Sequence, residues 1–140
     1  MDLDICHEIV DARDYGVVHC NLIKIEWLTL EELVPKFDLL FSPQTYREIE
    51  REKAKKVTEF VLQYDLAYDS EIMNSLQAED LASRFLAYFE DEESQYYTNG
   101  DWYKEPPRRG WTPATTATFD AGILVVGRSR AGCLWVEDED

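Results

Sequence analysis

Two apolar runs joined by a short polar segment constrain the fold of this chain most. They are residues 118–126, "TFDAGILVV", and residues 131–137, "AGCLWVE", with "GRSR" between them. Strand-like runs on either side of such a segment predict a β-hairpin. The second run leads into four consecutive acids, residues 137–140. We expect its strand to be buried where it closes a sheet, and the acids to discourage edge-to-edge pairing with other chains.

Three stretches in the middle of the chain predict helices. Thr29 and Glu32 form a capping box, so a helix should begin directly after Thr29. Ser42, followed by proline, predicts the start of an amphipathic helix over residues 44–64. Asn74 caps a third helix, whose apolar stripe leads into an acidic run.

The beginning of the chain is less defined. Residues 17–27, "VVHCNLIKIEW", predict a strand, whereas the stretch before it, residues 3–10, fits either a strand paired with it or a short helix ending at Gly16. Together the elements predict an α+β fold, with about three helices packed on a small, mostly antiparallel sheet that ends in a C-terminal β-hairpin. Residues 1–140 have the length of a single domain, and 45% hydrophobic residues argue against disorder despite a net charge of −15.

Negative charge is concentrated in the middle of the chain. Residues 61–105 carry eleven acidic residues against two basic ones, a local net charge of −9. Such a surface repels nucleic acid and anionic membranes and attracts basic partners. The N-terminal residues are acidic where a signal peptide needs positive charge, and no apolar run reaches membrane-spanning length. We therefore expect a cytoplasmic protein that binds a basic protein partner. We expect this chain itself to contact neither nucleic acid nor a membrane.

Two neighbouring features of this acidic region indicate a functional surface. Four acids at residues 90–93 follow the third helix, where the helix dipole favours cations. A local rule broken without visible compensation often marks a functional site. Residues 94–117 then form a long segment without helical or strand periodicity that contains five Tyr and Trp residues. Loops of this length are uncommon in compact domains and are usually functional or disordered.

The cysteines and histidines do not predict a catalytic or metal site. Cys6-His7 and His19-Cys20 are mirror images, which suggests a zinc site. In a hairpin, however, both cysteines would point to one side of the sheet and both histidines to the other, so the four could not share one ion. The sequence also contains no catalytic motif of recognised spacing. We expect reduced thiols, no metal, no cofactor and no enzymatic activity.

The acidic and aromatic residues together predict a protein-binding surface, because interface hot spots are rich in Trp and Tyr while charge steers the approach. Trp102 is the best candidate for a single anchor, and the sequence leaves open whether the loop that carries it is exposed or packed. The predicted partner-binding residues are Glu90, Asp91, Glu92, Glu93, Tyr96, Tyr97, Asp101, Trp102, Tyr103, Glu137, Asp138, Glu139 and Asp140.

These features favour a non-catalytic, acidic inhibitor of the bacterial immunity type. It would bind and mask the basic active site or nucleic-acid-binding cleft of a toxin or nuclease, by imitating phosphate charge. One alternative is a phage-type DNA mimic that blocks a restriction or CRISPR complex, which predicts acids along an extended surface. Another is a small enzyme with the 94–117 loop as a lid. That enzyme would need His7 or His19 in a cleft with a carboxylate or thiol.

Overall fold

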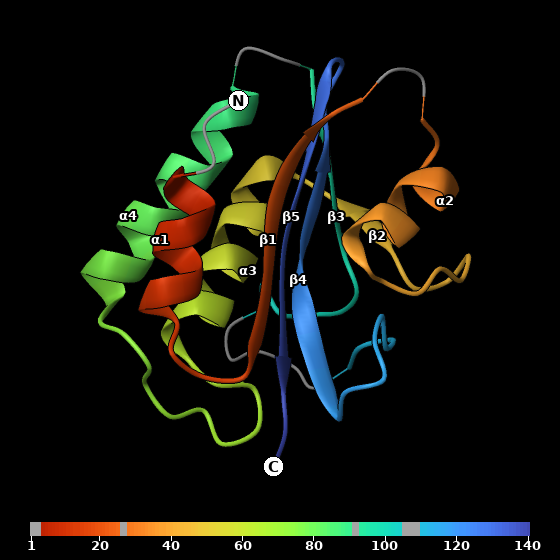
Figure 1. Ribbon diagram of the computed structural model, residues 1–140. Helices are drawn as coiled ribbons and strands as arrows, with labels where there is room; N and C mark the ends of the chain where they lie inside the picture. Colours follow the sequence, from red (N-terminus) through yellow and green to blue (C-terminus); the bar gives the residue numbers. More distant parts are fainter. Residues whose placement is uncertain (1–3, 26–27, 91–92, 105–109) are drawn as a thin grey trace.

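The protein is an α+β fold built on one antiparallel sheet. The computed structural model describes residues 4–25, 28–90, 93–104 and 110–140. Within these ranges four α-helices accompany a five-stranded sheet of strand order β1-β5-β4-β3-β2 (Figure 1), which confirms the predicted fold class. The elements are α1 (Asp4–Ala12), β1 (Val17–Lys24), α2 (Leu30–Leu33), the 3₁₀ helix η1 (Val34–Phe37), β2 (Arg47–Ile49), α3 (Arg51–Gln63), α4 (Ser75–Leu86), the 3₁₀ helix η2 (Ala87–Phe89), β3 (Gln95–Thr98), β4 (Phe119–Val126) and β5 (Arg130–Asp138).

The predicted hairpin forms the centre of the sheet. Strands β4 and β5 pair antiparallel from Val126↔Ala131 to Phe119↔Asp138. The other edge of β5 pairs with β1, far away in sequence. Side chains of β5 alternate between two cores: Leu134 packs with the helices, and Trp135 with the opposite side. Both faces of β5 are thus covered, which explains why its sequence is apolar on both of them.

Helices cover the two faces of the sheet unequally. Figure 1 shows α1, α3 and α4 together on one side of the sheet and the short α2 on the other. The larger core lies under the three helices and includes Ile9, Val61 and Phe85. The smaller core lies under α2 and η1 and includes Leu33 and Phe37. The second face is covered only in part: Val17 of β1 is exposed, and His19 of β1 and Glu137 of β5 are half-buried.

Two of the three predicted helix starts are confirmed. Thr29 and Glu32 form both hydrogen bonds of the capping box before α2, and Asn74 caps α4 by accepting from the backbone of Gln77. The start predicted at Ser42 is wrong, because α3 begins at Arg51. Residues 47–49 instead form β2 and pair with β3, so a sheet partner distant in sequence overrides the local cap.

The open choice at the N-terminus is resolved in favour of a helix. Residues 4–12 form α1, which turns Ile5 and Ile9 into the larger core at a spacing of one helical turn. The alternative of a strand paired with β1 is wrong. No helix in the described part of the chain is long and apolar enough to cross a membrane.

A buried ion pair joins the first helix to the last strand. The Arg13 guanidinium, directly after α1, donates to both carboxylate oxygens of Asp138, at 3.1 and 2.8 Å, and both side chains are fully buried. Arg13 Nε also donates to the Val61 carbonyl at 2.6 Å, and the backbone N–H of Leu66 donates to Asp138 at 2.8 Å. The pair therefore links α1, β5 and the end of α3.

A second buried carboxylate organises the predicted loop. Asp120 accepts hydrogen bonds from Asn99, from the backbone of Ala114 and Thr115, and from the indole of Trp135. Burial raises the pKa of Asp120, and these donors act in the opposite direction by stabilising the carboxylate. The described part of the predicted loop, residues 94–104 and 110–117, is thus not structureless: it contains β3, and Gly100 forms a β-bridge with Trp111.

Candidate protein-binding surface

Apart from Asp101, the predicted acids that the structure describes lie in two groups at opposite ends of the sheet. Glu90 and Glu93 precede β3, whose Gln95 pairs with Val126 beside the β4–β5 turn. The acids that end β5 lie at the other end, where Asp138 pairs with Phe119. Figure 1 shows the same separation, with the C-terminus at the bottom and the end of α4 at the top. Asp91 and Glu92 lie outside the described residues.

The group at the end of α4 is partly neutralised. Glu90 is exposed and lies 3.4 Å from Arg51, whose side chain is 40% exposed. Exposed ion pairs of this kind contribute little to stability, but they do reduce the local negative field. Arg51 also donates to the hydroxyl of Tyr96, at 2.9 Å, so a guanidinium lies between two of the residues predicted to bind the partner, Glu90 and Tyr96. Glu93 is exposed.

Trp102 is part of the core, so of the two alternatives left open for the aromatic loop this residue takes the packed one. It is only 1% exposed and its indole N–H donates to Asn99 at 3.0 Å. Its ring stacks on Phe60 of α3 with centroids 6.0 Å apart, and the Trp111 ring lies 5.3 Å away. The loop folds back because burial of these rings outweighs the ordering of its backbone.

Three further aromatic residues of this segment are also buried or half-buried. Tyr96 is buried at 7% exposure, and Tyr97 and Tyr103 are half-buried. The ammonium of Lys53 lies 4.9 Å from the centre of the Tyr103 ring, a cation–π distance. Asp101 lies 3.7 Å from Arg47 and 3.5 Å from Lys104. The segment therefore offers a partner neither free aromatic rings nor uncompensated charge at these positions.

The four terminal acids differ in environment. Asp138, one of the predicted partner-binding residues, is buried against Arg13 and does not reach the surface. Glu137 faces the opposite side of β5 and is half-buried, whereas Glu139 and Asp140 are exposed. Glu139 accepts hydrogen bonds from the side chain and backbone of Thr118, which lower its pKa and keep it ionised.

Exposed apolar side chains lie directly beside these acids. A shallow pocket of about 280 Å³ is lined by Tyr15, Gly16, Val17, Ala117, Glu137 and Glu139. Tyr15 is 37% and Val17 53% exposed, large fractions for side chains of this kind. Loss of solvent contact, and after it the nearby carboxylates of Asp65 and Asp138, raises the pKa of Tyr15, while Arg13 acts to lower it.

A second shallow pocket adjoins the first through a histidine. It measures about 240 Å³, and its lining includes His19, Lys36 and Asp38. His19 Nε2 contacts the carboxylate of Glu137 from the neighbouring strand. The two pockets thus form one region, which we call the Glu137 surface; it comprises Tyr15, Val17, His19, Asp38, Glu137 and Glu139.

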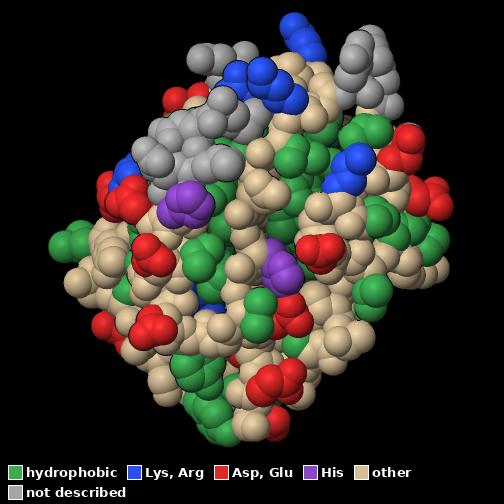
Figure 2. Space-filling view, in the orientation of Figure 1, with side chains coloured by type: hydrophobic (Ala, Val, Ile, Leu, Met, Phe, Trp, Pro, Cys, Tyr) green, Lys and Arg blue, Asp and Glu red, His purple; other side chains and the backbone are tan. Residues whose placement is uncertain are grey.

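The Glu137 surface combines charge and apolar area in one place. Figure 2 shows acidic side chains over the lower half of this face with hydrophobic side chains between them, while most of the visible Lys and Arg side chains lie near the top. Lys36 contributes one positive charge at the edge of the second pocket, against the carboxylates of Asp38, Glu137 and Glu139. The balance remains negative.

The sequence did not identify Tyr15 and Val17 as surface residues, although a signal was present. Gly16 between them has φ +65°, and a Cβ there would collide with Asp138. A glycine in the left-handed region before a strand marks a tight turn. The partner of that turn, the end of β5, cannot be read from the local sequence.

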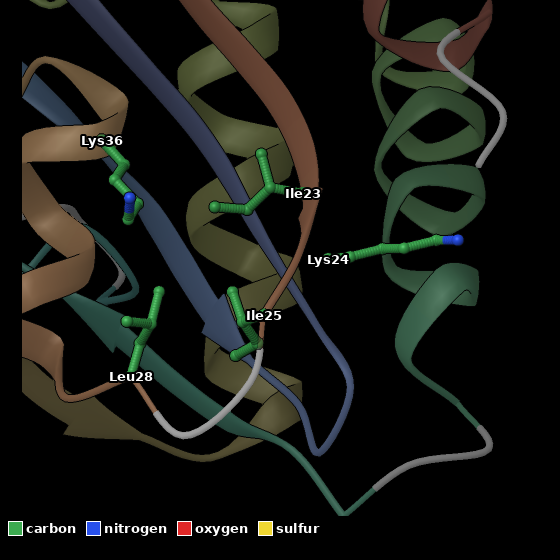
Figure 3. Close-up of a pocket in the computed structure, with 5 residues that line it drawn as sticks. All are labelled: Ile23, Lys24, Ile25, Leu28 and Lys36. Atoms are coloured by element: carbon green, nitrogen blue, oxygen red, sulfur yellow. The ribbon is translucent and has the colours of Figure 1, made fainter.

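A larger pocket of about 530 Å³ lies at the other end of β1 and has a different character. It is lined by Ile23, Lys24, Ile25, Leu28 and Lys36. Figure 3 shows Lys24 pointing away from the other four side chains, so that three aliphatic groups and the Lys36 side chain face one another. This pocket is apolar and basic, and it does not extend the acidic surface.

Among the described residues, no group of three or more His, Cys, Asp or Glu side chains is placed to hold a metal ion. Comparison with protein-family models, curated proteins and solved structures finds no significant match to this chain. The chemistry of its own surface is therefore the basis for assigning it a function.

Proposed function

We propose that this protein is a non-catalytic, acidic inhibitor of the immunity type, acting in the bacterial cytoplasm. It binds a basic protein, a toxin or nuclease, and masks its active site or nucleic-acid-binding cleft. The observation that carries the proposal is the Glu137 surface, where Glu137 and Glu139 line a pocket with the exposed side chains of Tyr15 and Val17.

The two components of this surface have separate roles in binding. A cleft that holds phosphates presents Lys and Arg, and the carboxylates of Asp38, Glu137 and Glu139 can take the place of phosphate charge. These charges attract the partner at a distance and orient it on approach. Tyr15 and Val17 lose their remaining exposure on contact, which slows dissociation.

The arrangement of acids favours an inhibitor over a DNA mimic. A DNA mimic needs carboxylates spaced along an extended surface. The described acids before β3 and at the end of β5 instead lie in two separate groups at opposite ends of the sheet, and Arg51 lies beside Glu90 in one of them. A compact acidic patch with an apolar centre fits a single cleft on a protein.

The test begins with affinity capture of the partner from the source organism, identified by mass spectrometry. Stopped-flow association with the purified partner should then slow steeply with added salt, while dissociation changes less. Replacing Glu137 and Glu139 together by Gln should lower the association rate roughly tenfold at low salt. The matched control replaces Glu90 and Glu93 by Gln at the other end of the sheet and should change it little.

The outcomes distinguish failure of the proposed inhibitor function from failure of the Glu137 surface as its binding site. If the control pair slows association and the Glu137/Glu139 pair does not, the protein is still an acidic inhibitor but binds through the end of α4. An association rate independent of salt, or a captured partner without a basic cleft, rejects the inhibitor itself. Tyr15→Ala should speed dissociation about thirtyfold, equivalent to about 2 kcal/mol, whereas Tyr15→Phe keeps the ring and should bind nearly as the parent.

One observation favours the enzyme alternative. His19 contacts Glu137 in a shallow pocket that also holds Asp38, and a histidine oriented by a carboxylate can act as a general base. His19→Gln separates the two functions. If the protein is an inhibitor, this variant should weaken inhibition of the captured partner less than the double replacement of Glu137 and Glu139 does. If the pocket is catalytic, it should abolish turnover.

A further inference from the structure

Two cysteines that are separated in sequence meet at the boundary between α1 and β1. Cys6 lies on α1 and Cys20 on β1, with their sulfur atoms 2.9 Å apart. Cys6 is only 2% exposed, and Cys20 is half-buried. A disulfide bond is about 2.05 Å long, so the sulfurs need to approach by only about 0.9 Å to form one.

The packing of α1 brings these thiols together. Cys6 follows Ile5 on the face of α1 that enters the larger core. On β1, alternation sends Cys20 and Leu22 to the helical side of the sheet, and His19 to the other. A backbone that is held by the core on both sides needs no rearrangement to place the thiols in contact.

We propose that Cys6 and Cys20 form a redox-active thiol pair that closes to a disulfide on reaction with a small peroxide. The Cys6 thiolate attacks one peroxide oxygen, the O–O bond breaks, and Cys6 becomes a sulfenic acid while the other oxygen leaves as water. The Cys20 sulfur then attacks the Cys6 sulfur, expelling the second oxygen as water. Overall, two thiols and hydrogen peroxide give one disulfide and two water molecules, so two electrons pass from sulfur to oxygen.

The hydrogen bond between the two thiols distinguishes the cysteine that attacks the peroxide, Cys6, from the one that then closes the disulfide, Cys20. Cys20 donates its S–H to Cys6, and this hydrogen bond lowers the pKa of Cys6 and favours its thiolate. The same contact, together with burial, raises the pKa of Cys20, which keeps its proton until Cys6 has reacted. Cys6 is only 2% exposed, which excludes attack by a bulky disulfide such as oxidised glutathione.

The third cysteine provides an internal control. Cys133 is fully buried on β5 and packs in the smaller core, on the other side of the sheet from Cys6. Burial raises the pKa of Cys133, so its thiolate is disfavoured. All three cysteines are free thiols in this structure. A reducing compartment keeps the pair open, and the disulfide would form only when peroxide rises.

The experiment treats reduced, full-length protein with a slight excess of hydrogen peroxide. Intact mass should fall by two hydrogen atoms, and alkylation after unfolding should label one cysteine where the reduced protein has three. Peptide mapping should join Cys6 to Cys20. The new bond closes a short loop, so the melting temperature should rise by about 5–10 °C and return on reduction.

Variants make the result decisive even if one of them folds poorly. Cys133→Ser should form the disulfide like the parent. Cys20→Ser should stop at a Cys6 sulfenic acid, which dimedone traps when it is present during unfolding. Cys6→Ser should resist oxidation at low peroxide. The proposal is overturned if the parent keeps three alkylatable thiols, if Cys133 enters the linkage, or if Cys20 alone is oxidised to a sulfinic acid.

Discussion

Asp138→Asn should strongly destabilise the protein, although it changes one acid among four consecutive ones. Both members of the Arg13–Asp138 pair are completely buried, and the carboxylate accepts from both guanidinium nitrogens and from the backbone of Leu66. An amide of the same shape removes the charge and turns an NH₂ group toward one of these donors. Breaking a buried pair in this way costs about 3–5 kcal/mol, because the remaining charge stays buried without a counter-ion.

Urea unfolding followed by tryptophan fluorescence measures this loss. With an m-value of about 2 kcal/mol per molar, the midpoint should fall by about 2 M. Asp140→Asn is the matched control: Asp140 is exposed, and its replacement should change stability by less than about 0.5 kcal/mol. Replacing Arg13 by Met and Asp138 by Leu together should recover much of the loss, since an apolar pair leaves no charge unsatisfied.

A small effect would refute the reasoning. If Asp138→Asn lowers stability by less than about 1 kcal/mol, or no more than Asp140→Asn, the pair does not hold α1 and β5 together in solution. The Arg13→Met/Asp138→Leu double variant could even be more stable than the parent without contradicting the buried ion pair, because apolar residues in place of such a pair are often neutral or stabilising.

Two further predictions follow from side chains near the candidate surface. Trp102→Ala should lower the free energy of unfolding by about 3–5 kcal/mol, because it empties a buried site between Phe60 and Trp111. It should leave partner binding per folded molecule unchanged. Calorimetry measures the first quantity and binding kinetics the second. Glu139 should titrate below an ordinary glutamate in an NMR pH series because Thr118 donates to it, and Thr118→Ala should raise that pKa. Since its pKa is lower in the folded state, the stability from Glu139 is present above the unfolded-state pKa and is lost as pH falls through the folded-state value.

The features that the sequence predicts correctly depend on neighbouring residues. Thr29 with Glu32, and Asn74 before α4, satisfy backbone N–H groups within a few residues, so their role can be read from spacing alone. The β4–β5 hairpin is local in the same sense. The start of α3 was missed because residues 47–49 pair with β3, whose sequence lies some fifty residues further along.

The candidate surface was harder to predict for the same physical reason. An aromatic residue in a loop can be exposed or packed, and for Trp102 the decision depends on Phe60, which arrives from α3. Asp138 and Asp140 are the same residue type two positions apart, but only Asp138 meets Arg13. Tyr15 and Val17 gain their significance from β5, at the far end of the chain.

The pairing of β1 with β5 has a consequence for synthesis on the ribosome. Lys24 ends β1 and pairs with Arg130, so its partner strand is translated about 100 residues later. At about 5–20 residues per second, β1 waits roughly 5–20 seconds with an unpaired edge and with the apolar side of α1 uncovered. The β4–β5 hairpin can close quickly once made, whereas the first strand can join only afterwards. Nascent chains of this protein should therefore depend on chaperones during elongation, and a slowed ribosome should lengthen the period in which they can aggregate.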